Sequence, residues 1–286
     1  MNSLEWTVRE NRLLPGDCGR LLVETPAAAA KPPRPGQFYM VRVGHGGDPL
    51  LRRPISVSAV KLGINEPGGN PMIRISFLYK VVGRGTSIMA RLQPGEAVDC
   101  LGPIGNGFTI PGPEAPPRFR QPRLAVLVAG GIGVAPFPML ADALQKNDIA
   151  VRLYFGGRSE HDLVELDHFV SRGVETVTAT EDGSRGEQGF VSAPLARDLE
   201  SMAGGRTVIY ACGPNPMMTA VIDLCRNHEL PVEVSLETRM ACGLGVCLGC
   251  VVPLAEPSPN GNADYRRVCQ DGPVFNGEEV DLGLFL

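Results

Sequence analysis

The amino-acid sequence predicts a multi-domain chain with an antiparallel β-barrel, an α/β domain built on a parallel sheet, and a small cysteine-bearing subdomain at the C-terminus. Three observations predict this order. Short strands with alternating apolar and polar residues recur within residues 1–112. A continuous apolar run at 124–129 leads into a glycine-rich turn and a helical segment, which is how a βαβ unit begins. Four of the eight cysteines then fall within residues 237–286.

The composition is that of an ordinary globular protein. With 286 residues the chain has room for two domains or three small ones. Hydrophobic residues make up 43%, charged residues 20%, and the net charge is -4, so the sequence offers no basic surface for nucleic acid. The longest apolar runs are too short to span a bilayer, and residues 1–6 contain Glu5 and lack the apolar core of a secretory signal. We therefore expect a cytoplasmic protein with neither a nucleic-acid nor a membrane partner.

Residues 1–112 are expected to fold as a small barrel. Residues 20–24 and 37–43 are β-favouring runs bounded by proline and glycine, and apolar residues occupy every second position from 73 to 79. Alternation with one polar face is typical of antiparallel strands over a core. Several such strands in so short a segment indicate a closed barrel.

Two stretches of the barrel domain could bind a phosphate-bearing cofactor. In Arg52-Arg53-Pro54-Ile55-Ser56, an arginine can neutralise a pyrophosphate, and the extended backbone after the proline offers polar groups to a planar ring. In Gly83-Arg84-Gly85-Thr86-Ser87, glycines allow close approach to phosphate, and Thr86 or Ser87 can cap a short helix through 88–92. Taken singly, the first stretch could simply begin an edge strand and the second could be an ordinary turn.

Residues 113–122 are proline-rich and are expected to form an extended linker to an α/β nucleotide domain at 123–236. The first strand of that domain, 124–129, is apolar throughout, as a strand buried on both faces should be. It leads through Gly130-Gly131-Ile132-Gly133 to Pro136 and a helix at 137–145. Further strands are expected at 151–155, 174–179 and 207–211, and further helices at 163–170, 193–202 and 216–228.

A glycine turn between a first strand and a helix is where dinucleotide phosphates bind. The turn departs from the G-x-G-x-x-G pattern because Pro136 replaces the third glycine, so by itself it is a weak signal. A second element, Tyr210-Ala211-Cys212-Gly213-Pro214, ends another strand and opens a helix. Considered alone, Cys212 is most simply a small buried apolar residue at a strand end.

The last fifty residues carry Cys242, Cys247 and Cys250 at C-x4-C-x2-C spacing, with Cys269 after a further eighteen residues. This is the ligand spacing of plant-type [2Fe-2S] ferredoxins. Glycines at 243, 245 and 249 strengthen the prediction, because a loop around a cluster needs unusual φ/ψ values and N–H groups aimed at sulfur. Structural zinc is the alternative, although zinc sites more often pair two C-x2-C knuckles. Disulfides are less expected in a chain of this size without a secretory signal.

Taken together, these motifs resemble the ferredoxin reductase superfamily, and their order along the chain resembles the electron-transfer subunits of class B dihydroorotate dehydrogenases. The resemblance implies FAD, a nicotinamide nucleotide and a [2Fe-2S] cluster as cofactors. It implies that FAD is held by Arg53, Pro54, Ile55, Ser56, Leu78, Tyr79, Lys80, Gly83, Gly85, Thr86 and Ser87. It places the nucleotide at Gly130, Gly131, Gly133, Gly213 and Pro214, with Cys212 as the catalytic residue near the nicotinamide. The metal ligands would be Cys242, Cys247, Cys250 and Cys269.

The function implied by this resemblance is an electron relay. A hydride carries two electrons whereas a [2Fe-2S] cluster passes one at a time, so a flavin must stand between them. The partner would be an FMN-containing dihydroorotate dehydrogenase catalytic subunit of pyrimidine biosynthesis, in a hetero-oligomer such as a heterotetramer. Two alternatives stay open: a flavin subunit that serves ferredoxin or another redox partner, as in NAD(P)H:ferredoxin oxidoreductases and sulfhydrogenases, and a nucleotide-binding regulatory module with structural zinc. Arg158, followed closely by Glu160, leaves NADP open beside NAD.

Overall fold

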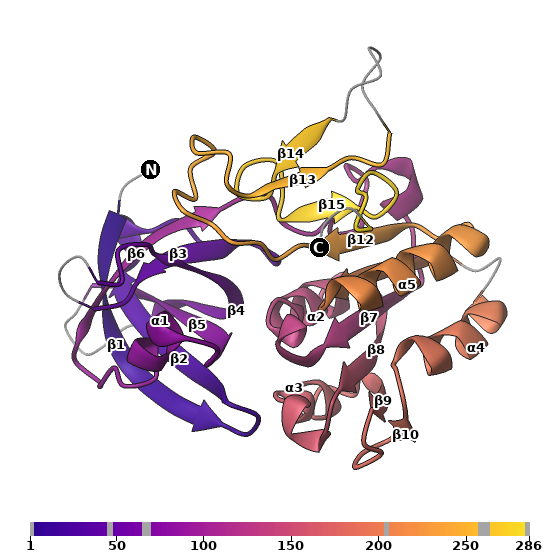
Figure 1. The fold of residues 1–286 in the computed structure, drawn as a ribbon, viewed down its shortest axis with the longest axis horizontal. Helices are drawn as coiled ribbons and strands as arrows, with labels where there is room; N and C mark the ends of the chain where they lie inside the picture. The colour runs from indigo at the N-terminus through magenta and orange to yellow at the C-terminus, as the bar shows by residue number, and fades with distance from the viewer. Residues whose placement is uncertain (1–2, 45–47, 65–69, 203–205, 257–263, 284–286) are drawn as a thin grey trace.

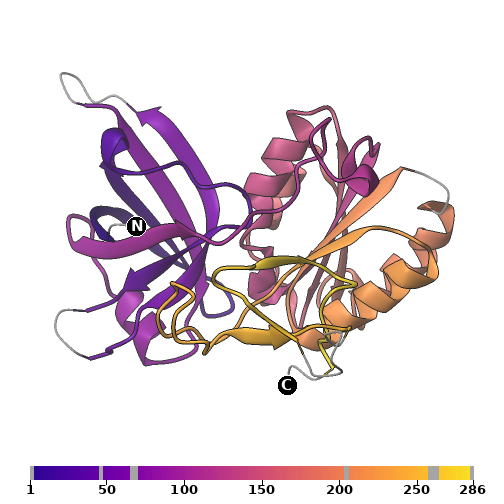
Figure 2. The ribbon, with the colours of Figure 1, turned by 90° about the horizontal axis from the view of Figure 1, so that it is seen from above.

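The computed structural model describes residues 3–44, 48–64, 70–202, 206–256 and 264–283. A barrel formed by the first third of the chain stands beside an α/β region, and the C-terminal segment lies across both (Figure 1). Figure 2 shows the same arrangement from above, with the C-terminal segment spanning the two larger bodies. Among the described residues, no helix combines the length and hydrophobicity needed to cross a bilayer.

The barrel is closed by six antiparallel strands in the order β1-β2-β5-β4-β3-β6. Their bounds are β1 (Ser3–Leu14), β2 (Cys18–Pro26), β3 (Phe38–Arg42), β4 (Arg53–Ile64), β5 (Met72–Lys80) and β6 (Ala97–Ile104). Inside, Tyr39 packs edge-to-face against both Trp6 and Phe77, each at a centroid distance of 5.7 Å. The predicted antiparallel barrel is confirmed, and the aromatic residues fill an interior that is too narrow for a channel.

Two short helical turns, η1 (Ala27–Ala29) and α1 (Arg84–Met89), complete the barrel domain. Helix α1 begins earlier than the sequence predicts, with Gly83 as its N-cap. The prediction that Thr86 or Ser87 caps this helix is therefore wrong. Thr86 lies in the first turn, and its hydroxyl accepts the N–H groups of Val82 and Gly83 at 3.0 and 3.2 Å. The hydroxyl thus stabilises the glycine loop from inside the helix.

The α/β region contains a seven-stranded sheet in the order β10-β9-β8-β7-β11-β12-β15. All neighbouring strands are parallel except β12 and β15, which run antiparallel. The strands are β7 (Leu124–Gly130), β8 (Ala150–Gly157), β9 (Glu175–Thr180), β10 (Glu187–Gln188), β11 (Thr207–Cys212), β12 (Val232–Ser235) and β15 (Val274–Asn276). The helical elements are η3 (Gly131–Val134), α2 (Phe137–Gln145), η4 (Glu160–Asp162), α3 (Leu166–Val170), α4 (Ser192–Met202) and α5 (Asn215–Asn227).

Both faces of this sheet are covered, which explains the uninterrupted apolar run of β7. Val126 and Val128 point into the core shared with α4 and α5, whereas Ala125, Leu127 and Ala129 point into the core shared with α2 and α3. A central parallel strand has no solvent-facing side, so the alternation of polar residues disappears. The predicted parallel-sheet domain is confirmed.

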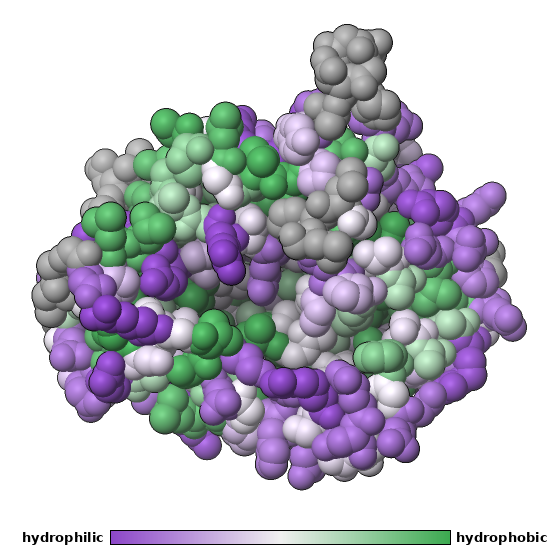
Figure 3. Space-filling model, in the orientation of Figure 1, coloured by the Kyte–Doolittle hydropathy of each residue, from purple (hydrophilic) through white to green (hydrophobic). Residues whose placement is uncertain are grey.

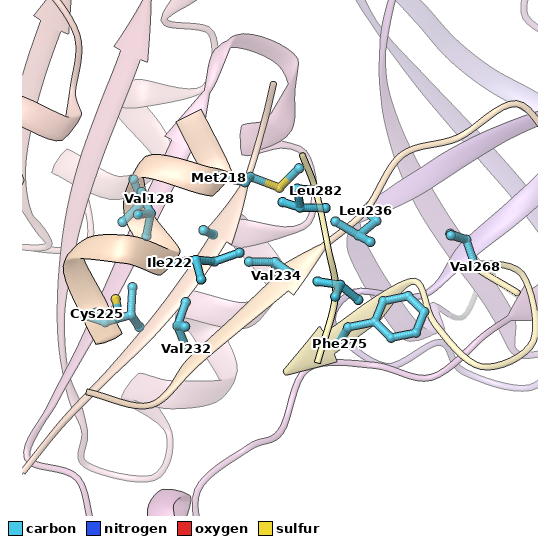
Figure 4. Packing of buried hydrophobic residues seen from close by; sticks show 14 of the residues in the cluster. Val128, Met218, Ile222, Cys225, Val232, Val234, Leu236, Val268, Phe275 and Leu282 are labelled. Atoms are coloured by element: carbon cyan, nitrogen blue, oxygen red, sulfur yellow. The ribbon is translucent and has the colours of Figure 1, made fainter. Parts of the chain in front are cut away.

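The C-terminal segment is tied to the nucleotide sheet more closely than the sequence indicates. It contains the two-stranded sheet of β13 (Val251–Pro253) and β14 (Tyr265–Arg267), and it donates β15 to the edge of the large sheet. Phe275 on β15, Leu236 and Ile222 of α5 belong to one apolar cluster, as Figure 4 shows. The segment at 113–122 likewise packs against the domain, because it contains the turn η2 (Pro117–Phe119) and buries Phe119 beside Tyr210.

Replacing Phe275 with alanine should destabilise the chain by about 3–5 kcal/mol, because a buried phenyl ring is lost from the cluster that joins the C-terminal segment to α5. The measurement is the free energy of unfolding in urea. Phe190→Ala is the matched control, since this phenylalanine is 69% exposed and its removal should cost under about 0.5 kcal/mol. Equal losses in both variants would show that β15 does not anchor the segment.

Candidate functional site

Two cavities meet where the barrel faces the α/β region. The larger, of about 900 Å³, lies at the C-terminal ends of the parallel strands. The smaller, of about 290 Å³, lies against β4 and β5 of the barrel. Lys80, Ile132 and Glu237 line both cavities, so the two spaces adjoin at these side chains. Molecules bound in the two cavities would therefore lie next to each other.

The larger cavity forms at the switch point of the sheet. Strand β7 is hydrogen-bonded to β8 on one side and β11 on the other, and the connections from β7 and β11 leave in opposite directions. Ligands of open parallel sheets bind in the crevice at such a point. The glycine turn after β7 and the Gly213-Pro214 turn after β11 both line the cavity. The structure thus brings together two motifs that lie about eighty residues apart in the sequence.

Packing between the two turns explains why glycine is needed at two of the three positions. A Cβ at Gly133 would stand 2.3 Å from the carbonyl oxygen of Cys212, and one at Gly130 would stand 2.6 Å from Pro214. Gly131 differs, because it has φ +52° and no atom within 4 Å of where its Cβ would be. Its backbone therefore faces open space, in a conformation that favours glycine, and it is accessible to a phosphate.

Cys212 is buried behind the cavity wall, where Gly213 and Pro214 form the lining. Burial raises the pKa of its thiol well above the ordinary value, and the nearby carboxyl of Glu237 raises it further, although a hydrogen bond with Ser235 acts in the opposite direction. A thiol that stays neutral contributes packing and polarity at this point. Its predicted role beside the nicotinamide stays a prediction.

The smaller cavity is lined by most of the residues predicted to hold the flavin. They are Arg53, Pro54, Ile55, Ser56, Leu78, Tyr79, Lys80 and Thr86. Gly83, Gly85 and Ser87 lie next to it in the glycine loop. A Cβ at Gly85 would stand 2.4 Å from Nε and 2.9 Å from Cζ of Arg53, so a larger residue here would displace the guanidinium. The arginine is thereby held at the mouth of the cavity, where it can meet a pyrophosphate.

Arg52, just before β4, and Arg53, its first residue, have different roles. The guanidinium of Arg52 donates to the carboxylate of Asp99 at 2.5 Å and to its carbonyl at 3.0 Å, and so ties the strand to β6. Arg53 instead donates to the carbonyl of Leu51 at 2.6 Å and lines the cavity. Of the pair, only Arg53 is positioned for a ligand in this cavity. These residues would suit a flavin cofactor: a guanidinium for its pyrophosphate and strand backbone for its planar ring.

Sequence reasoning missed part of the site. Ser235, Leu236, Glu237, Thr238 and Met240 line the smaller cavity, and Phe190 and Glu181 line the larger one. The segment at 235–240 follows a parallel strand, and the ends of such strands were the available signal. Glu237 is reached by solvent from the cavities, yet protein surrounds it, and this burial raises the pKa of its carboxyl. Among the described residues, it is the one carboxylate that lines both cavities.

The cysteine loop follows directly from this wall. Gly243 and Gly245 have φ values of +69° and +77°, and the N–H of Gly245 points at the sulfur of Cys269 at 3.2 Å. The N–H of Leu244 points at the sulfur of Cys242 at 3.3 Å. The expectation that Gly249 has a special conformation is wrong, because the left-handed residue at this turn is Leu248, with φ 55°. Amide groups aimed at sulfur are typical of an iron-sulfur loop.

The four cysteines interact as two pairs. Cys242 is hydrogen-bonded with Cys247, and Cys250 with Cys269. A [2Fe-2S] cluster takes two thiolates on each iron, whereas zinc takes four donors around one ion. The donor set therefore fits a binuclear cluster.

The two pairs differ in their surroundings. Burial raises the pKa of Cys269 to about 12, with the neighbouring Cys250 adding to the effect. Burial also acts to raise the pKa of Cys242, but N–H groups of Leu244, Cys247 and Val246 lower it to about 6. Cys250 and Cys269 are buried, whereas Cys247 is exposed. One side of the donor set is thus enclosed by the protein and the other side faces outward.

Hydrophobic side chains surround this outward side. Leu244, Val246 and Leu248 are 46%, 79% and 60% exposed. The hydropathy surface in Figure 3 shows apolar side chains gathered on the upper part of this face, where the C-terminal segment meets the barrel. Exposed apolar residues that cluster around a functional loop are typical of a protein-binding surface.

Comparisons with known proteins agree with this geometry. Residues 237–281 match the family described as the iron-sulfur cluster binding domain of dihydroorotate dehydrogenase B. Residues 127–223 match the oxidoreductase NAD-binding domain. The chain is 39% identical, over 86% of each chain, to a protein of Desulforamulus reducens named dihydroorotate dehydrogenase B (NAD(+)), electron transfer subunit. A protein of Bacillus caldolyticus with the same name is 40% identical over 87% of each chain.

Solved structures share the fold over most of the chain. A structure described as NADH-dependent reduced ferredoxin-NADP oxidoreductase, studied for flavin-based electron bifurcation, superposes with a TM-score of 0.79 at 25% identity. The match covers 99% of this chain and 92% of that one. A ferredoxin NADP+ reductase of Neisseria gonorrhoeae with bound FAD and NADP superposes with a TM-score of 0.62 at 16% identity. That match covers 80% of this chain and 92% of the reductase, and it supports the fold alone.

Gly133→Ala should destabilise the nucleotide domain by about 1–3 kcal/mol, because its Cβ would collide with the backbone at Cys212. NADH binding should weaken in parallel, since the two turns must separate. Gly112→Ala is the control, because a Cβ there has no neighbour within 4 Å. Urea unfolding and NADH titration measure both effects. A Gly133 variant as stable as the control would contradict the packing described.

Glu237→Gln should weaken NAD+ binding relative to NADH by roughly tenfold, because an ionised carboxylate favours the positively charged oxidised ring. Since burial raises the pKa of Glu237, this preference should grow in the native protein as pH rises through that pKa, and the glutamine variant should lack the trend. Glu233→Gln is the control, because Glu233 lies on the preceding strand, is hydrogen-bonded to Thr109, and lines neither cavity. Dissociation constants across a pH series are the measurement. An unchanged trend in the Glu237 variant would remove this carboxylate from the site.

Proposed function

The chain belongs to the family of electron transfer subunits of dihydroorotate dehydrogenase B (NAD(+)), and we propose that it relays electrons between NAD(H) and an FMN-containing dihydroorotate dehydrogenase subunit. FAD and a [2Fe-2S] cluster are its cofactors. We place FAD in the cavity against β4 and β5, the nucleotide in the cavity at the switch point, and the cluster on Cys242, Cys247, Cys250 and Cys269. The activity belongs to pyrimidine biosynthesis, and we propose the cytoplasm as its location.

One feature of the structure supports this proposal most directly. Residues between Ser235 and Met240 line the flavin cavity, and Glu237 among them also lines the nucleotide cavity. Cys242 lies two residues after Met240. The three sites are therefore connected through a short stretch of chain. A Cβ at Gly243 would stand 2.5 Å from the side chain of Met40 on β3, so the cysteine loop also rests on the barrel. This arrangement favours a short electron-transfer distance between the flavin and the cluster, which a cluster domain separate from the barrel would not provide.

The residues of the chain bind and orient rather than supply acid-base chemistry. Arg53 and the glycine loop hold phosphate, the glycine turns after β7 and β11 hold the dinucleotide, and Glu237 faces the junction of the cavities. FAD, when bound, supplies the step between two-electron transfer with nicotinamide and one-electron transfer with the cluster.

We propose NAD rather than NADP as the nucleotide. Arg158 lines the larger cavity and could receive a 2′-phosphate, but the carboxylate of Asp162 lies 3.6 Å from its guanidinium. Glu181 adds a second carboxylate to the same wall. Negative charge at this position disfavours a 2′-phosphate and suits ribose hydroxyls. The ratio of kcat/KM for NADH to that for NADPH tests the assignment, and a ratio below one would contradict it.

The apolar surface around Cys247 is where we place the partner subunit, and the protein would then work within a hetero-oligomer. A ferredoxin-linked partner is the second candidate, favoured by the likeness to the ferredoxin-NADP oxidoreductase structure. The two candidates differ in the protein that meets this surface. A regulatory module with structural zinc is a third, but the pairing of the cysteines favours a binuclear cluster over a single ion.

Cys247→Ser should remove the cluster while leaving the flavin site in place, because Cys247 is exposed and lies outside both cavities. We expect the anaerobically purified variant to lose the brown iron-sulfur absorption and electron transfer to the partner. NADH-to-dye activity should stay within about twofold of the native value. If the variant also loses dye reduction, the cysteines support the fold instead of the relay.

The partner assignment predicts a stable complex with an FMN-type dihydroorotate dehydrogenase and NAD-dependent oxidation of dihydroorotate by that complex. The measurement is co-expression, purification and assay, with ferredoxin reduction by NADH measured on the same sample. Val246→Asp should weaken the complex, because it puts a charge in the apolar surface. Absence of a complex together with efficient ferredoxin reduction would favour the second candidate.

A further inference from the structure

Lys80 lies on β5, the strand that lines the flavin cavity, yet its side chain pairs with a residue of the nucleotide domain. It is the last residue of β5 and lines both cavities. Its ammonium group donates to the carboxylate of Asp162, with 2.7 Å between Nζ and Oδ1. The two side chains are only 20% and 8% exposed. The charge of Lys80 is therefore committed to a contact between the barrel and the nucleotide domain.

Asp162 uses its second oxygen on the nucleotide side of the same contact. Its Oδ2 accepts the backbone N–H of Arg158 at 3.1 Å and lies 3.6 Å from the guanidinium Nε of that residue. Arg158 and Asp162 both line the larger cavity. One buried carboxylate thus contacts the end of β5 with one oxygen and the loop at 157–162 with the other. A buried ion pair offsets its desolvation only in close to ideal geometry, so this pair fixes the position of β5 relative to that loop.

The backbone around the contact is equally close. A Cβ at Gly16, in the turn between β1 and β2, would stand 2.4 Å from the carbonyl oxygen of His161. A Cβ at Gly157 would stand 2.8 Å from Cβ of Asp162. The turn at Gly16 therefore packs directly on the backbone of His161, and a displacement of the loop at 157–162 moves Asp162 relative to β5.

We propose that Asp162 and Lys80 form an interdomain latch that sets the position of the flavin strand relative to the bound nucleotide, with Asp162 as a positioning residue for hydride transfer. The latch touches the nucleotide cavity through Arg158 and the flavin cavity through Lys80. Hydride transfer depends steeply on the distance and alignment of the two rings. The inference rests on the proposed assignment of the two cavities.

A second interdomain ion pair provides the matched control. Arg20 on β2 pairs with Glu165, the residue that precedes α3, and its Nε lies 3.0 Å from the carboxylate. Glu165 is three residues beyond Asp162 and nearly as buried, but neither Arg20 nor Glu165 lines either of the two cavities. Loss of this pair removes a similar contact between the same two bodies. It should leave the relative position of the rings unchanged if the latch sets it.

The experiment measures flavin reduction by NADH in stopped flow, using full-length protein with its FAD and cluster. The variants are Lys80→Met, Asp162→Asn, the double variant and Glu165→Gln, each normalised to FAD content. Saturation with NADH separates the limiting rate from the dissociation constant. We expect Lys80→Met and Asp162→Asn each to lower the limiting rate roughly ten- to a hundredfold. The double variant should be no slower than the slower single variant, and Glu165→Gln should match the native rate.

Three outcomes would overturn the latch. Equal rate losses in the Asp162 and Glu165 variants would mean that both pairs only hold the domains together. An unchanged limiting rate in Lys80→Met would mean that the position of β5 relative to the nucleotide does not depend on the Lys80–Asp162 pair. An Asp162→Asn protein that fails to fold or to retain FAD would show a structural support instead of a positioning residue. If native protein itself is not reduced by NADH, the proposed function fails before the latch is tested.

Discussion

The segment from Ser235 to Cys242 is constrained at both ends, and the arrangement of the three sites depends on this constraint. At its start, β12 pairs with β11 and β15, and the N–H of Leu236 donates to the carbonyl of Pro273 at 2.9 Å. At its end, Gly243 lies against Met40 of the barrel. A two-electron donor and a one-electron carrier must lie close to the same flavin. Because this segment is fixed at both ends, the residues that line the flavin cavity and the cluster ligand Cys242 keep a defined position relative to each other.

The remaining contacts between the domains hold the barrel in register with that segment. The side chain of Asn106, just beyond β6, donates to the carbonyl of Val274 at 2.8 Å and accepts the N–H of Val274 at 3.0 Å. Thr109 donates its backbone N–H to the carboxylate of Glu233 at 2.8 Å. On the opposite side, Asp162 holds Lys80. The flavin cavity is thus enclosed by contacts from the C-terminal segment and from the nucleotide loop.

Local motifs were readable from the sequence because their chemistry is local. The spacing of Cys242, Cys247 and Cys250, the glycine turn after β7 and helix α2 each follow from a few neighbouring residues. Strands β1 and β6 were not predicted and β4 only at its start, because barrel closure comes from pairing between residues far apart in the chain. The addition of β15 to the nucleotide sheet was likewise out of reach, since it depends on Phe275 packing against α5. Glu237 begins the sequence pattern that leads into the cysteine loop, but its place at the junction of the two cavities follows only from the fold.

The expectation for Gly249 shows where such reasoning goes wrong. A glycine in a tight loop is often in the left-handed conformation, yet Leu248 has the positive φ here and Gly249 does not. Sequence alone does not say which of two neighbouring residues takes the strain. Two adjoining cavities and N–H groups aimed at sulfur support the assignment of FAD, nucleotide and cluster to these side chains.

Low-temperature EPR of the anaerobically purified protein, before and after NADH is added, tests most directly whether the cysteine loop receives electrons from the nucleotide site. NADH should bleach the flavin absorption and also produce the signal of a reduced [2Fe-2S] cluster, without any partner protein present. Bleaching of the flavin with no signal from an intact cluster would contradict this expectation, because the cysteine loop would then not receive electrons from the nucleotide site.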